Sequence, residues 1–221
     1  REHEILDHAR DGVDGLYSMV GGKLASYRLF SEEMTDVIAR RLGRGSACQS
    51  HILALPGGDE PVDPMRLVLE GGMEAVTATR LEYRHGSRSL RILERMQRDP
   101  REAAVACVCE PVTVAEVRDV VDQELATDVE DVARRTRLGL GACGGMRCAA
   151  RCGRIVADAT GKSPAEGLAM AMRFLRASAR KRSAAVGAAQ ARAEALALGS
   201  LRAELGAAAD EPGEGRSGES E

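Results

Sequence analysis

The segments Cys107–Cys109 (Cys-Val-Cys) and Cys143–Cys148 (Cys-Gly-Gly-Met-Arg-Cys) place two cysteine pairs on either side of a stretch with helical patterning. Two capping-box patterns, at residues 113–116 and 127–130, predict helix starts between the pairs. Each cysteine pair therefore falls in a loop beside a helix start. We expect the four thiolates to surround one metal centre, in a domain of short helices joined by glycine-rich loops.

The composition favours helices and argues against several classes of protein. Of 221 residues, 44% are apolar but only 2% are aromatic, so the core must be built from aliphatic side chains and methionine, which suits helix packing. A formal charge of −3 gives no reason to expect nucleic acid as a partner. No apolar run approaches the roughly 20 residues that cross a bilayer. Six cysteines without a secretion signal indicate a reducing, cytoplasmic location, where metal binding is commoner than disulfide formation.

The first part of the chain predicts a strand, a glycine turn and a helix. The strand lies near residues 15–20, the turn is Gly21-Gly22, and apolar spacing predicts a helix from Lys23 to about Leu42. A single strand–helix unit has no sheet to join, so we expect partner strands outside this chain. The start at Arg1 also suggests a piece of a longer protein.

The remaining chain divides by its breakers and its composition. Asp63-Pro64 predicts a helix start, and Tyr83–His85 before Gly86 predicts a helix end with exposed polar groups. The fold class we predict is mainly α. We expect four segments: residues 1–45, the truncated end of a larger domain; 46–100, a small helical domain; 101–182, the cysteine domain; and 183–221, an Ala-rich helix, either solvated or docked on a partner, then a disordered tail from Gly206.

The cysteine spacing favours an iron–sulfur cluster over zinc. A [2Fe–2S] cluster takes four thiolates, whereas structural zinc sites favour a gap of two to four residues between paired cysteines, wider than in Cys-x-Cys. The glycines around Cys143 would let backbone N–H groups approach the sulfurs, and nearby arginines would offset the negative charge. These arginines are Arg137, Arg147 and Arg151. We expect the unmatched Cys48 and Cys152 to be small buried apolar residues, with Cys152, one helical turn beyond Cys148, as the substitute ligand.

Two of these motifs carry a family resemblance. The segments 107–117 (Cys-Val-Cys-Glu-Pro-Val-Thr-Val-Ala-Glu-Val) and 134–148 (Arg-Arg-Thr-Arg-Leu-Gly-Leu-Gly-Ala-Cys-Gly-Gly-Met-Arg-Cys) resemble the bacterioferritin-associated-ferredoxin-like [2Fe–2S] domain. The second also resembles the C-terminal end of the A subunits of the anaerobic, FAD-dependent glycerol-3-phosphate dehydrogenases. Residues 12–28 (Gly-Val-Asp-Gly-Leu-Tyr-Ser-Met-Val-Gly-Gly-Lys-Leu-Ala-Ser-Tyr-Arg) are similar to the segment that ends their FAD domain. The helices between would be the cap domain that follows it.

The resemblance implies a site for each cofactor. Gly21, Gly22 and Lys23 would face the flavin, with Lys23 near its N1/C2 edge, although Ala25 replaces a threonine that the family often has. Without the resemblance, the glycines would be ordinary turn residues and Lys23 an ordinary helix-start lysine. The four cysteines at 107, 109, 143 and 148 would hold the [2Fe–2S] cluster. Electrons would pass from FAD to the cluster, then to other subunits of a membrane-associated complex and to quinone, at the inner face of the cell membrane.

Two other interpretations of the sequence remain open. The chain could be a stand-alone ferredoxin-like or zinc-stabilised module that binds another protein. It could also be the tail of a related FAD oxidoreductase that acts on another small substrate. The dinucleotide-binding start and the substrate-oxidising residues of the family do not occur in this sequence, so the chain alone is not expected to be catalytic.

Overall fold

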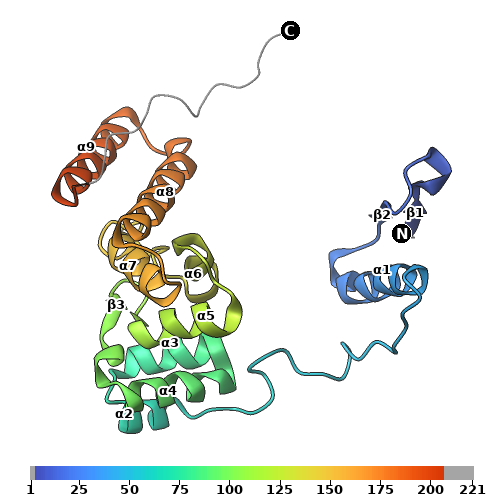
Figure 1. Cartoon of the computed structure of the whole chain (residues 1–221), viewed down its shortest axis with the longest axis horizontal. Helices are drawn as coiled ribbons and strands as arrows, with labels where there is room; N and C mark the ends of the chain where they lie inside the picture. Colours follow the sequence, from blue (N-terminus) through green and yellow to red (C-terminus); the bar gives the residue numbers. More distant parts are fainter. Residues whose placement is uncertain (1–2, 207–221) are drawn as a thin grey trace. The chain divides into compact units, whose positions relative to one another are not determined.

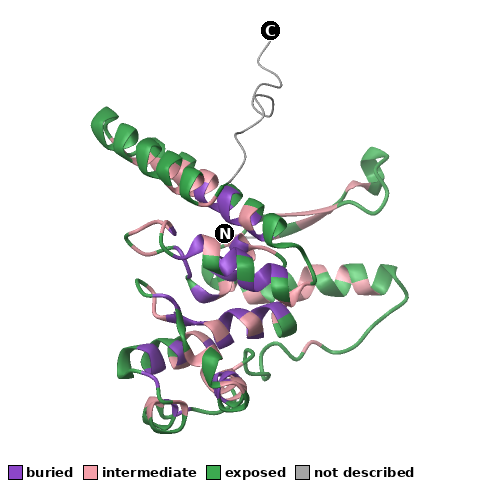
Figure 2. Ribbon diagram, turned by 60° about the vertical axis from the view of Figure 1, so that its left-hand side comes forward, coloured by how far each residue is buried: buried purple, intermediate pink, exposed green. Residues whose placement is uncertain are grey.

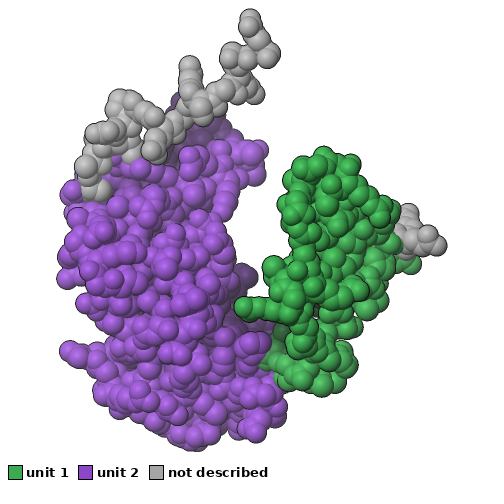
Figure 3. Space-filling view, turned by 45° about the vertical axis from the view of Figure 1, so that its right-hand side comes forward, with its two compact units in different colours: residues 1–55 green, residues 56–221 purple. Residues whose placement is uncertain are grey.

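The chain forms two compact units in the computed structural model, which describes residues 3–206. Unit 1 comprises residues 1–55 and unit 2 comprises residues 56–221, drawn in green and purple in Figure 3. The elements are mainly helical, as the sequence predicts. From residue 207 on, the disordered tail that we expect after Leu205 lies outside the described residues. The bounds of the four predicted segments remain predictions. In the described part of the chain, no helix combines the length and the apolar character needed to span a membrane.

Unit 1 is a β-hairpin followed by a helix. Strand β1 (His3–Asp7) pairs antiparallel with β2 (Tyr17–Gly21), with His3 opposite Gly21. The expectation that this strand lacks a partner within the chain was therefore wrong. Helix α1 (Tyr27–Arg41) begins later than expected, after a single 3₁₀ turn (Leu24–Ser26). None of residues 3–55 is buried (Figure 2), so this unit has no core of its own.

The first part of unit 2 contains the helices α2 (Pro64–Gly71), α3 (Ala75–His85) and α4 (Ser89–Arg98), which lie together in Figure 1. The predicted start at Asp63-Pro64 is confirmed, because the Asp63 carboxylate accepts a hydrogen bond from the backbone N–H of Met65. Leu67, Leu81 and Ile92 are fully buried between these helices. The end of α3 touches the preceding connector so closely that a Cβ on Gly86 would lie 1.9 Å from the carbonyl oxygen of Gly57.

The second part of unit 2 carries the four cysteines. A two-stranded hairpin joins β3 (Val105–Cys107) to β4 (Val112–Thr113), a pairing that the sequence did not predict. Five helices follow in the described chain: α5 (Val114–Glu124), α6 (Val129–Thr136), α7 (Ala149–Ala159), α8 (Pro164–Ser183) and α9 (Ala188–Glu204). Aliphatic side chains of α5 to α8 form most of one core. Leu198 and Leu201 of α9 are partly buried and pack against this core, so α9 contacts its own chain through one side while most of the helix stays exposed.

The predicted helix caps are correct in part. The Thr113 hydroxyl accepts from the Glu116 backbone N–H as expected, but the Glu116 side chain binds Arg84 and His85 instead of completing the capping box. The cap of α6 is Asp128, one residue later than the expected threonine. At the start of α8, both halves of the capping box formed by Ser163 and Glu166 are present.

We expect Ser163→Ala to lower the free energy of unfolding by about 1 kcal/mol, because the first turn of α8 loses its side-chain cap. The matched control is Ser200→Ala, in the interior of the exposed helix α9. It should leave stability unchanged or raise it by a few tenths of a kcal/mol, roughly the difference in helix propensity. Urea unfolding of the two variants checks this, and equal effects would contradict the cap.

Candidate metal centre

The four cysteines of the two motifs line one pocket of about 100 Å³ in unit 2. Cys107 ends strand β3, and Cys109 lies in the turn that follows it. Cys143 lies in the glycine-rich loop before α7, and Cys148 is the residue from which α7 begins. The pocket is completed by Ala106, Val108, Arg147 and Arg151. The structure thus brings together the side chains that the sequence paired only by spacing.

The thiols meet in two pairs, each with one cysteine from either motif. The thiol of Cys107 interacts with that of Cys148, and the thiol of Cys109 with that of Cys143. The Cys148 thiol also donates to the Gly145 carbonyl oxygen at 3.8 Å. The bond from Cys148, with backbone N–H groups near the sulfur, lowers the pKa of Cys107 to about 5, while the same pairing and burial raise the pKa of Cys148. In the second pair, the pKa of Cys109 is raised by its bond to Cys143. In the first pair, the thiolate of Cys107 is therefore favoured over that of Cys148.

Backbone N–H groups lie near the sulfurs of Cys107 and Cys143. Those of Gly139, Glu110 and Cys109 interact with the Cys107 sulfur. Burial by itself raises the pKa of Cys143, but the N–H groups of Arg147 and Gly145 and the Cys109 thiol outweigh it, so its pKa is lowered. Hydrogen bonds of this kind stabilise metal-bound sulfur and shift the potential of iron–sulfur clusters.

The glycines of the second motif allow this close approach. A Cβ on Gly141 would lie 2.6 Å from the Cβ of Cys109. Gly145 has a φ of +87°, and a Cβ there would lie 2.6 Å from the Phe174 ring. A larger residue at Gly141 would push the loop away from Cys109, and one at Gly145 would push it away from Phe174.

The four cysteines share a pocket but do not form a ready-made ligand set. Among residues 3–206, no three or more His, Cys, Asp or Glu side chains are arranged to hold a metal ion. Four thiols around one pocket are the donor set that either a [2Fe–2S] cluster or a structural zinc ion takes.

Cationic side chains lie around the pocket. Arg147 and Arg151 line it, and Arg151 also donates to the carbonyl oxygen of Val105. Arg137 ends α6 in a left-handed conformation, with a φ of +65°, and its Nε donates to the Glu110 carboxylate at 3.1 Å. All three predicted arginines are therefore near the cysteine segments, although Arg137 is paired with an acid.

The two remaining cysteines behave differently from each other. Cys152 is fully buried in the core, as predicted, and burial raises the pKa of its thiol. Cys48 is only half-buried, and its sulfur lies 3.1 Å from the Ser50 hydroxyl oxygen. The expectation of a buried apolar Cys48 was therefore wrong, because unit 1 has no core that could bury it.

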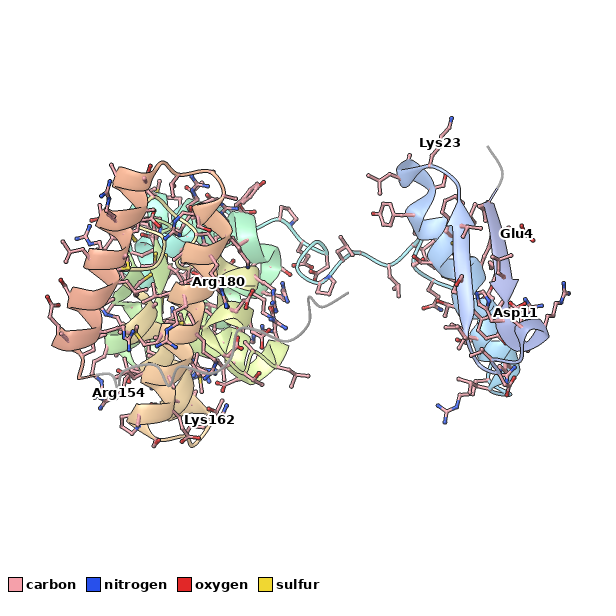
Figure 4. The ribbon with its side chains drawn as sticks, turned by 90° about the horizontal axis from the view of Figure 1, so that it is seen from above. Glu4, Asp11, Lys23, Arg154, Lys162 and Arg180 are labelled. Carbon is pink, nitrogen blue, oxygen red and sulfur yellow. The ribbon has the colours of Figure 1, made fainter. Side chains whose placement is uncertain are left out.

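The predicted flavin-facing turn has unusual backbone geometry. Gly21 and Gly22 have φ values of +86° and +79°, and a Cβ on Gly22 would lie 2.2 Å from the Phe30 ring. Lys23 is exposed and extends away from the ribbon in Figure 4. A 3₁₀ turn (Leu24–Ser26) follows Lys23 directly, and α1 begins after it at Tyr27.

A buried charged cluster lies next to the cysteine hairpin, and sequence reasoning missed it. Arg84 and His85 were expected to be exposed, yet their side chains are only 5% and 1% exposed and both contact the fully buried carboxylate of Glu116. The signal for His85 was present: it follows the buried Ala78 and Leu81 at helical spacing. No local pattern pointed to the pairing of Arg84 with Glu116.

The chain is similar to one protein family and to several curated proteins. Residues 48–167 match the family model of the C-terminal domain of alpha-glycerophosphate oxidase. The A subunit of the anaerobic glycerol-3-phosphate dehydrogenase of Escherichia coli is 40% identical over 151 residues, which are 66% of this chain and 27% of that protein. The corresponding protein of Haemophilus influenzae is 37% identical, covering 66% of this chain and 26% of that protein.

An archaeal relative agrees with these. The A1 subunit of the anaerobic glycerol-3-phosphate dehydrogenase of Haloferax volcanii is 35% identical over 152 residues, which are 68% of this chain and 25% of that protein. The chain thus spans about a quarter of the length of the curated relatives that it matches. No solved structure matches the chain.

Proposed function

The chain belongs to the family of the C-terminal domain of alpha-glycerophosphate oxidase, and from this premise we propose that it is the C-terminal portion of an FAD-dependent glycerol-3-phosphate dehydrogenase. In this proposal, its cysteine domain resembles the bacterioferritin-associated ferredoxins and holds a [2Fe–2S] cluster. The ligands are Cys107, Cys109, Cys143 and Cys148. Electrons leave through this domain toward partner subunits and, through them, toward quinone, with the chain peripheral to the cell membrane.

The observation that carries the proposal is the arrangement of the four thiols around one pocket in two cross-motif pairs. A purely structural role for four free cysteines would not require them to face one another. The relatives named as glycerol-3-phosphate dehydrogenases supply the substrate. FAD is the cofactor that the family resemblance implies.

When bound, the cluster supplies one-electron transfer. Residues of the chain would offset the negative charge of the cluster. They are the backbone N–H groups near the Cys107 and Cys143 sulfurs and the guanidinium groups of Arg147 and Arg151 at the pocket. Cys109 is exposed, which leaves one edge of the site open to a partner. An exposed edge shortens the distance over which an electron must travel to that partner.

For the flavin end, we propose that Gly21, Gly22 and Lys23 face the flavin in the complete enzyme. The left-handed glycines bring the backbone into a tight turn, and the exposed ammonium group of Lys23 is free to stabilise a reduced, anionic flavin. This role depends on a flavin domain that lies outside residues 3–206.

Anaerobic reconstitution of the chain with iron and sulfide tests the proposal. We expect about two irons per chain and a visible absorbance that dithionite bleaches. A colourless protein that binds about one zinc ion, and no cluster, would instead support a zinc-stabilised binding module. Metal analysis together with visible spectroscopy separates these outcomes.

A further inference from the structure

Arg84, near the end of α3, contacts both a buried acid and the backbone of the cysteine hairpin. Its Nε and Nη2 donate to the two carboxylate oxygens of Glu116, at 2.7 and 2.9 Å. The same guanidinium donates from Nη2 to the Pro111 carbonyl oxygen at 3.0 Å and from Nη1 to the Glu110 carbonyl oxygen at 3.4 Å. One rigid, planar group therefore joins α3, α5 and the turn between β3 and β4.

The two carbonyls that Arg84 holds belong to the turn that carries Cys109. Glu110 follows Cys109 directly, and Pro111 follows Glu110. Because Arg84 holds the carbonyl oxygens of both residues, it limits rotation of the backbone immediately after Cys109. Arg84 thus acts on the position of Cys109 through the backbone of the turn.

The position of Arg84 is itself fixed. The Glu116 carboxylate is fully buried and balances its charge, and the Nε2 atom of His85 lies 2.9 Å from the same carboxylate. A buried, doubly hydrogen-bonded ion pair has little freedom to move. The carbonyl oxygens of Glu110 and Pro111 are therefore held by a side chain that itself has little freedom to move.

We propose that Arg84 is a positioning residue for the Cys107–Cys109 arm of the cluster site. The inference rests on the proposed [2Fe–2S] function and deepens it. By holding the carbonyl oxygens of Glu110 and Pro111, Arg84 keeps the turn after Cys107 in place and so fixes the position of Cys109 relative to Cys107. Residues that hold the ligands of a metal site in this way typically change its metal affinity by about 10- to 100-fold when they are altered.

The competing explanation is that Arg84 only fastens α3 to α5. The chain offers a matched control for this, since Arg91 on α4 makes an equally bidentate pair with Asp119 on α5, at 2.7 Å for both bonds. The Asp119 carboxylate is almost as buried as that of Glu116, but these two bonds of Arg91 go to α5 and do not reach the cysteine hairpin. If the only role of these arginines is to hold their helices against α5, substitution of Arg84 and substitution of Arg91 should have similar effects on the cluster site.

The test compares reconstituted Arg84→Lys and Arg91→Lys with the unaltered chain. Lysine keeps the charge but cannot bridge a carboxylate and two carbonyls at once. For Arg84→Lys we expect the cluster to be lost to a chelator about 10- to 100-fold faster, with a changed electron paramagnetic resonance spectrum of the reduced cluster. Arg91→Lys should keep the original spectrum and lifetime, even where its thermal stability falls.

Two outcomes would overturn the inference: an unchanged spectrum and lifetime in Arg84→Lys, or equal changes in both variants. If Arg84→Lys does not fold, Glu116→Gln carries the test, because the amide leaves one oxygen to accept from Arg84 and should shorten the cluster lifetime partway. An unaltered lifetime in that variant would then count against the inference. Failure of the unaltered chain to take up any cluster would instead reject the proposed function.

Discussion

Cys109→Ala is expected to abolish cluster binding, and Cys148→Ala is expected to do the same. Each iron takes two thiolates, so the loss of one cysteine leaves an iron with an incomplete set of ligands. Cys109 is exposed, so its replacement should leave the fold intact and separate ligand loss from unfolding. Iron content and visible absorbance after reconstitution measure the loss, and far-ultraviolet circular dichroism monitors the fold.

Cys48→Ala is the control, because Cys48 does not line the cysteine pocket and should leave the iron content unchanged. Cluster retention in Cys109→Ala or Cys148→Ala would mean that the ligand set is misassigned. The substitute would then be Cys152, whose backbone N–H bonds to the Cys148 carbonyl one turn away. We expect it not to substitute, because Cys152 is fully buried in the core and does not line the cysteine pocket.

Gly153→Ala is expected to lower the free energy of unfolding by about 3 kcal/mol, although alanine is the better helix former. Helices α7 and α8 cross at Gly153 and Gly167, and a Cβ on Gly153 would lie 2.1 Å from the Gly167 carbonyl oxygen. Backbone cannot give way as a flexible side chain can, so the two helices must separate. Chemical unfolding of unit 2 provides the measurement.

Gly199→Ala gives the opposite sign. Gly199 lies in α9, and a Cβ added there would have no atom within 4 Å, so alanine should stabilise the helix by about 0.5–1 kcal/mol. Stabilisation by both substitutions would show that α7 and α8 do not cross as closely as Gly153 and Gly167 indicate.

The parts of the structure that depend on local pattern were predictable from the sequence. The helix starts at Asp63 and Ser163 were predictable from capping residues next to proline. That four cysteines gather around one pocket was predictable from their spacing beside glycine loops; they are Cys107, Cys109, Cys143 and Cys148. Which cysteine pairs with which was not predictable. Cys107 at the end of β3 meets Cys148 at the start of α7, and Cys109 in the hairpin turn meets Cys143 in the glycine-rich loop. This pairing depends on how the helices pack together, which the local sequence does not specify.

The errors arise where a distant residue competes with a local one. Glu116 fits a capping box, but Arg84, which lies 32 residues earlier, offers a buried charge that a backbone N–H cannot match. Strand β1 (His-Glu-Ile-Leu-Asp) was missed because it has only two apolar residues and no alternation, and its pairing with β2 fixes its structure. Leu125 ends α5 in the left-handed region without being glycine, so no turn signal marked that end.

The left-handed backbone at Arg137 bears on attempts to stabilise this protein by design. A residue with a side chain at a φ of +65° carries a strain of about 1–2 kcal/mol, which glycine would relieve. A search guided by backbone geometry would therefore choose Arg137 early. The same substitution would remove the guanidinium that reaches Glu110, beside the exposed Cys109. A gain in thermal stability at this position would therefore come with a less restrained turn around Cys109. Stability alone is a poor criterion for choosing substitutions in this protein.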